Sequence, residues 1–121
     1  MKKGKRGVIT MTDNGMVTIP NNVRMHIGEI AGLFGIYCGT AKKHIRTIEK
    51  SGIVEGDYAM GCTTDGRKVY PEYYGLEMII ALAFRVQSVK AHVFRKWIIR
   101  KITELRLSQT IILSLQKSAL N

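Results

Sequence analysis

Two apolar stripes at helical spacing, separated by a glycine, constrain the fold of this chain most strongly. The first stripe has the i, i+3, i+4, i+7 spacing of one helix face and consists of Ile27, Ile30, Ala31 and Phe34. The second consists of Ala41, Ile45 and Ile48. Gly35 lies between them, and glycine readily adopts the left-handed conformation that ends a helix. The sequence therefore predicts two short helices joined by a tight turn across residues 26–52, the arrangement of a helix-turn-helix.

The predicted second helix has a basic side away from its apolar stripe. We expect Thr40 to be its N-cap, because a threonine side chain accepts hydrogen bonds from amides of the first turn. The polar side chains that lie largely off the stripe are Lys42, Lys43, Arg46, Thr47 and Lys50. Such a helix suits DNA, since lysine contacts phosphates and arginine can read a guanine edge. A solvated basic face on an ordinary core helix is the alternative.

A β-hairpin is predicted on each side of this helical pair. Residues 8–19 hold two β-prone runs around Asn14-Gly15, and residues 53–73 hold two around Asp65-Gly66. The second hairpin directly follows the predicted second helix, which is the position of the wing in winged-helix folds. Arg67 and Lys68 come just after its turn, so we expect them to contact DNA phosphates. A plain surface hairpin is the alternative.

The C-terminal half is predicted to supply core helices. Residues 75–87 are apolar nearly all round, which predicts a central, buried helix. Ser88 is expected to cap a following helix that runs to about Leu105. The apolar stripe of that helix consists of Val93, Phe94, Trp97, Ile98, Ile102 and Leu105. Residues 106–121 are less regular, with apolar residues that fit one or two further helical turns.

The predicted fold class is therefore α+β: mostly helical with small antiparallel β-hairpins, as a winged helix-turn-helix-like domain extended by C-terminal helices. The predicted organisation is a basic arm at 1–7, one domain at 8–105 (helix-turn-helix 26–52, wing-like hairpin 53–73, core helices 75–105) and a C-terminal tail at 106–121. The chain has 121 residues, 19 Lys plus Arg and 9 Asp plus Glu, and a formal net charge of +10. That excess favours a polyanionic partner, above all nucleic acid.

No catalytic, metal-binding or cofactor-binding motif is found in the sequence. His26, His44 and His92 are widely spaced, and Cys38 and Cys62 form no CxxC pair. HExxH, P-loop, GxGxxG and GxSxG motifs are missing. We expect no enzyme activity, no metal, no cofactor and no small-molecule substrate. The cysteine usage, the lack of a secretory signal and the short apolar runs predict a cytoplasmic protein without a membrane partner.

Three segments of the second half form a wider pattern. They are DGRKVY at 65–70, YGLEMIIALAFRVQS at 74–88 and FRKW at 94–97. Over about residues 23–103 the chain resembles the RhuM-type virulence protein family of bacteria. It departs from that pattern at four places. The family has Asn where this chain has Gly75, Asp in place of Glu77, Gly-Tyr in place of Ala83-Phe84, and Asn in place of Gln87. The resemblance implies a DNA-binding regulator associated with mobile elements, and structural roles for Arg85, Ser88, Arg95 and Trp97.

Two functional hypotheses follow. The first is a DNA-binding regulatory protein that binds duplex DNA through the basic helix and the hairpin wing. DNA is expected rather than RNA, because few aromatic side chains lie outside the predicted core. The second is a protein-interaction module or effector fragment that uses the apolar helices from Gly75 onward. A homodimer is a further expectation, since helix-turn-helix proteins often read two half-sites.

Overall fold

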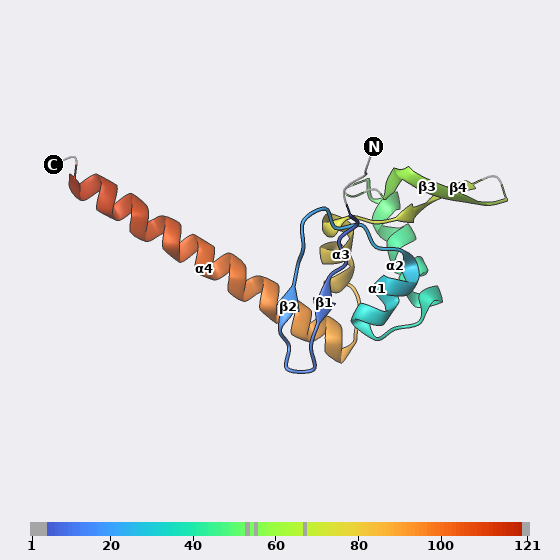
Figure 1. The fold of residues 1–121 in the computed structure, drawn as a ribbon, viewed down its shortest axis with the longest axis horizontal. Coiled ribbons are helices and arrows are strands. Elements are labelled where there is room, and N and C mark those ends of the chain that lie inside the picture. The colour runs from blue at the N-terminus through green and yellow to red at the C-terminus, as the bar shows by residue number, and fades with distance from the viewer. Residues whose placement is uncertain (1–4, 53, 55, 67, 120–121) are drawn as a thin grey trace.

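The computed structural model describes residues 5–52, 54, 56–66 and 68–119. The elements in chain order are β1 (Thr10–Met11), β2 (Val17–Thr18), α1 (Ile27–Phe34), α2 (Cys38–Lys50), β3 (Asp57–Asp65), β4 (Lys68–Tyr73), α3 (Leu76–Ala83) and α4 (Val89–Ala119). β1 pairs with β2 and β3 with β4, as separate two-stranded antiparallel sheets. Figure 1 shows α1, α2 and α3 gathered into one body, with the β3–β4 hairpin and α4 extending from it in opposite directions. The predicted α+β class is confirmed.

Helix α1 begins and ends as the sequence predicts. The Glu29 backbone N–H donates to Nδ1 of His26, and the His26 backbone N–H donates to the Glu29 carboxylate at 3.1 Å. This reciprocal capping box satisfies two backbone donors that an uncapped helix leaves open. At the other end Gly35 has φ of 63°, and the Ile36 N–H donates to the Ala31 carbonyl at 3.0 Å. Gly35 therefore makes the left-handed turn that leads into α2.

Helix α2 starts earlier than predicted. Its N-cap is Tyr37, which has extended backbone and no capping side chain, and its first residue is Cys38. The prediction that Thr40 is the N-cap is wrong, because Thr40 already lies inside the first turn with its side chain exposed. Ile36, in the turn, packs against the core, so the chain resumes a helix immediately after it. The predicted buried stripe is confirmed at Ala41, Ile45 and Ile48.

Both predicted hairpins are present. The first has strands of two residues each, shorter than the predicted span of 8–19, and Gly15 takes φ of 82° in its loop. In the second, Asp65 pairs with Lys68 across a turn that contains Gly66 at φ of 66°. The register of this hairpin shifts between Asp57 and Cys62, so the pairing of the two strands is irregular there. Residues 53, 55 and 67 of the predicted wing lie outside the described residues.

The core lies between α1, α2, α3 and the first turns of α4. The rings of Phe34 and Phe94 pack edge to face with their centroids 5.4 Å apart, and both side chains are fully buried. The predicted burial of residues 75–87 is confirmed in part: Met78, Ile79 and Leu82 of α3 have no exposed surface, but α3 ends at Ala83 and Phe84 is 50% exposed. Each such side chain stabilises the fold by roughly 1.5–3 kcal/mol through burial.

Ser88 and Arg95 tie α4 to its neighbours. The Ser88 hydroxyl accepts from the Ala91 N–H at 3.0 Å, so the predicted N-cap is confirmed, and it donates to the Phe34 carbonyl at 2.7 Å. Arg95 donates to the carbonyls of Ala83 and Val86 at the end of α3. These bonds satisfy carbonyls that a helix end leaves without an intrahelical partner.

Helix α4 is longer and less covered than the sequence predicts. It continues through the predicted tail to Ala119. Ile98 is buried, but Ile102 and Leu105 are each 61% exposed, so the prediction that they extend the packed stripe is wrong. The C-terminal part of the helix extends away from the other elements (Figure 1). Within the described residues, no helix combines the length and the apolar character that crossing a bilayer requires.

Candidate nucleic-acid interface

Helix α2 carries four of the predicted cations, of which Lys42, Lys43 and Lys50 are exposed and Arg46 is half-buried. Five of the predicted residues on this helix are exposed: Thr40, Lys42, Lys43, Thr47 and Lys50. At about 100° per residue, Lys43 and Lys50 lie opposite the buried stripe. The helix has one carboxylate, Glu49, which is half-buried on its flank and accepts from the Gly56 N–H at 3.4 Å. The exposed side chains of α2 therefore include no acidic group.

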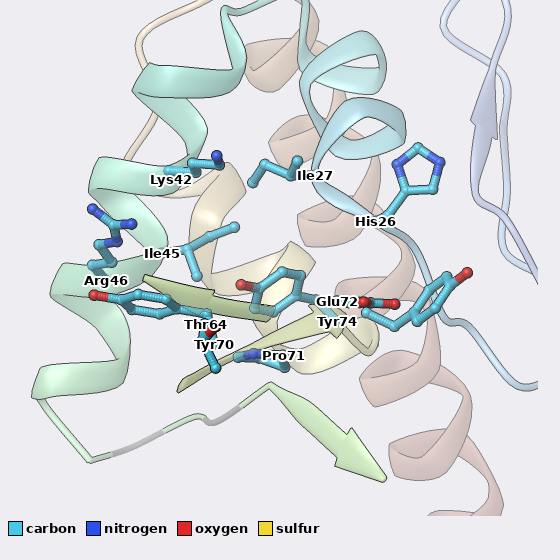
Figure 2. A pocket seen from close by; sticks show the side chains of 11 residues that line it. His26, Ile27, Lys42, Ile45, Arg46, Thr64, Tyr70, Pro71, Glu72 and Tyr74 are labelled. Atoms are coloured by element: carbon cyan, nitrogen blue, oxygen red, sulfur yellow. The ribbon is translucent and has the colours of Figure 1, made fainter. Parts of the chain in front are cut away.

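Arg46 joins α2 to the hairpin. Its guanidinium carbon lies 4.4 Å from the centroid of the Tyr70 ring of β4, a cation–π contact. The contact holds the guanidinium beside β4. Figure 2 shows Arg46 above the Tyr70 ring, with Lys42 one turn away on the same helix. Lys42 and Arg46 thus form the flank of α2 that faces β4.

A pocket of about 590 Å³ lies between this flank, the start of α1 and β4. It is lined by His26, Ile27, Lys42, Ile45, Arg46, Thr64, Tyr70, Pro71, Glu72, Tyr73 and Tyr74. In Figure 2 Lys42 and Arg46 extend from α2, the Tyr70 ring lies below Arg46, and Tyr74 and Glu72 lie farther from α2. The pocket therefore combines cationic donors with tyrosine rings, next to the basic side of α2.

A second arginine–tyrosine contact lies at the other end of β4. The Arg6 guanidinium lies 5.2 Å from the centroid of the Tyr73 ring and donates to both carboxylate oxygens of Glu29. Gly7 is held beside it, because its N–H donates to the Asn22 carbonyl at 3.0 Å. The described end of the predicted basic arm is therefore bound to the body, and residues 1–4 lie outside the described residues.

The Arg6–Glu29 pair shifts both pKa values. The hydrogen bond to Glu29 raises the pKa of the Arg6 guanidinium above its ordinary value and outweighs partial burial, which lowers it. Partial burial raises the pKa of the Glu29 carboxyl, but hydrogen bonds from Arg6 and from the His26 backbone, together with electrostatic attraction from these two residues, outweigh burial. The net pKa of Glu29 is below its ordinary value. The ionised carboxylate is therefore the form that the fold favours.

The predicted site residues do not all have a described position. Those from Thr40 to Lys50 share α2, while Lys68 is the first residue of β4 and Arg67 lies outside the described residues. Sequence reasoning missed the tyrosines of β4 and their arginine partners. The tyrosines at 70, 73 and 74 were a visible signal, but their partners are far away in the chain and only folding brings them together.

Metal-ligating side chains do not gather in the described part of the chain. No three of its His, Cys, Asp and Glu side chains lie close enough to hold a metal ion. Cys38 and Cys62 are both exposed and are not joined by a disulfide.

No family model, curated protein or solved structure matches this chain. The resemblance of residues 23–103 to the RhuM-type family stays a prediction from the residues that carry it.

Proposed function

We propose that this protein binds duplex DNA by placing the exposed basic side of α2 in the major groove. The observation that carries the proposal is the four cations of α2 without an exposed carboxylate among them. A polyanion is the partner that such a surface attracts, in a chain whose net charge is +10.

The dimensions of α2 fit this role. Its 13 residues span about 20 Å, and a helix with side chains is about 10–12 Å wide, close to the major-groove width of about 12 Å. Lys43 and Lys50, opposite the buried stripe, would contact phosphates. Arg46, whose guanidinium lies over the Tyr70 ring, would contact a guanine edge or a phosphate.

The pocket beside α2 supports the placement of the DNA backbone. A phosphate that follows the rim of the groove would lie between α2 and β4, within reach of Lys42 and Arg46. The contacts of Arg67 and Lys68 with the flanking backbone stay a sequence prediction, because Arg67 and the Lys68 side chain lie outside what the structure describes. We also propose that the domain is a winged helix-turn-helix. It is supported by the order α1, a turn at 35–37, α2 and then the β3–β4 hairpin.

From its resemblance to the RhuM-type family, we also propose that the protein is a DNA-binding regulator of RhuM-like type. Duplex DNA is favoured over RNA for a structural reason. Tyr70 and Tyr73 each have an arginine over one ring face, and Tyr74 is buried, so the tyrosines of β4 offer little ring surface for stacking unpaired bases.

The test is the double variant Lys43→Ala, Arg46→Ala, with duplex DNA affinity measured by fluorescence anisotropy over a series of salt concentrations. Loss of two phosphate contacts should reduce the slope of log affinity against log salt by about 1.8 and weaken binding about tenfold or more at low salt. The matched control is Lys96→Ala, Arg100→Ala, which removes the same two charges from exposed positions of α4. We expect the control to keep the parent slope. Equal slopes for both double variants would exclude α2 as the interface.

A further inference from the structure

The pocket beside α2 is larger and deeper than a contact with the DNA backbone requires. Its volume of about 590 Å³ is far more than one phosphate group fills. Pockets that hold small molecules have volumes of about 300–1,000 Å³. A DNA phosphate beside Lys42 and Arg46 would leave the interior of the pocket without an occupant. The pocket therefore has the size of a site for a small organic molecule.

The interior of the pocket is formed by apolar side chains and a tyrosine ring. Ile45 of α2, Pro71 of β4 and Tyr74 directly after β4 are buried. Ile27, the first residue of α1, is half-buried and also lines the pocket. Figure 2 shows Lys42 extending from α2 toward Ile27, with Ile45 and the Tyr74 ring below it in the view. An apolar ligand body placed among these side chains would be removed from water, which favours its binding.

The charged side chains of the pocket favour an anion. Lys42 and Arg46 contribute two positive charges and Glu72 contributes one negative charge, which leaves a formal charge of +1. His26 accepts from the Glu29 N–H through Nδ1, so this ring nitrogen carries no proton. Among the described residues, Lys42 forms no ion pair. A ligand with a single negative charge therefore balances the pocket.

We propose that this pocket binds a small aromatic carboxylate, with its ring between Ile27, Ile45 and Tyr74 and its carboxylate beside Lys42. The tyrosine lining favours an aromatic body, since aromatic rings attract each other edge to face. A doubly charged anion, such as the phosphate of a mononucleotide, would keep one unbalanced negative charge near Glu72. The sequence contains no motif for this ligand, because the lining comes from α1, α2 and the hairpin and only folding brings them together.

The ligand site itself does not depend on DNA binding. Its effect on DNA rests on the proposed function, in which Lys42 contacts a phosphate of the DNA backbone. The ligand carboxylate and this phosphate would use the same ammonium group, so they compete. An aromatic carboxylate in the pocket therefore weakens the binding of duplex DNA.

The first test follows amide NMR spectra of the isotopically labelled full chain, without DNA, during titration with indoleacetate. We expect shifts at pocket residues such as Ile27, Ile45 and Thr64. Indoleacetamide has nearly the same size but no charge, so it should bind about two- to fivefold more weakly, as the loss of an exposed ion pair predicts. The absence of shifts, shifts confined to α4, or equal affinity for the two compounds overturns the proposal. Tighter binding of adenosine monophosphate would overturn the choice of a singly charged ligand.

The second test compares two neighbouring lysines of α2. Lys42→Ala should weaken indoleacetate binding about two- to fivefold. Lys43→Ala is the matched control, because Lys43 is equally an exposed lysine of α2 but does not line the pocket. It should bind indoleacetate like the parent chain. Equal affinities of the two variants overturn the assignment of the carboxylate to Lys42.

The third test adds indoleacetate to the anisotropy measurement of DNA binding, with acetate at the same concentration as the ionic-strength control. Competition for Lys42 should weaken DNA binding about twofold or more relative to acetate. Unchanged DNA affinity at a concentration that saturates the pocket overturns the competition. A chain that binds indoleacetate but not DNA overturns the proposed function and supports the ligand site, so the two proposals fail separately.

Discussion

The guanidinium of Arg46 lies 4.4 Å from the centroid of the Tyr70 ring, and this contact connects α2 to the β3–β4 hairpin. Arg46 is half-buried on this helix. The ring restricts it to the flank that faces the pocket (Figure 2). Tyr70 is therefore expected to act as a positioning residue for a cation of the proposed DNA interface.

Replacing Tyr70 tests this relationship. Tyr70→Leu should weaken duplex DNA binding by about two- to fivefold, because a cation–π contact at an exposed site stabilises by roughly 0.5–1 kcal/mol. Tyr70→Phe keeps the ring and should bind like the parent chain. The measurement is fluorescence anisotropy at fixed salt. If Tyr70→Phe loses as much affinity as Tyr70→Leu, the hydroxyl matters and the stacking account is wrong.

Glu29→Gln tests the ion pair with Arg6. Glutamine can still accept the capping hydrogen bond, so the variant removes mainly the charge, and we expect a loss of about 1 kcal/mol of unfolding free energy at neutral pH. Because the folded-state pKa of Glu29 is lowered, its contribution is present above the unfolded pKa of about 4.3. The contribution is then lost as pH falls through the lower folded-state pKa.

Urea unfolding of both chains from neutral to acid pH measures that dependence. The difference between the parent chain and Glu29→Gln should shrink as the solution becomes more acidic than about pH 4. A difference that stays constant over the whole range would mean that the charge of Glu29 does not stabilise the fold.

Ser88→Ala tests the junction of α1, α3 and α4. The Ser88 hydroxyl caps α4 and also donates to the Phe34 carbonyl at 2.7 Å, so the variant should lose about 1–2 kcal/mol of unfolding free energy. Ser88→Thr keeps a hydroxyl and should retain most of the stability. Thermal and urea unfolding provide the measurement. Equal losses in both variants would indicate that the added methyl group disturbs the junction.

Local signals account for the elements that were predicted well. The capping residues and apolar spacing of residues 26–34 lead directly to α1, and Gly35 ends it as expected. Ser88 marks the start of α4 for the same reason, since a cap acts on amides within its own turn. Thr40 failed as a cap although its residue type is suitable. Burial of Ile36 set where α2 begins, and tertiary packing overrides a local preference.

By itself the sequence determined the helical pair, the hairpin that follows it and the basic side of α2, because side-chain periodicity and turn chemistry act within a few residues. Only the tertiary structure decided that Arg46 lies on Tyr70, since packing brings together residues that are far apart in the chain. It also decided that the stripe of α4 is buried at Ile98 and exposed at Ile102. The spacing of the two residues is that of one helix face. Their burial differs because the body against which the helix packs ends between them.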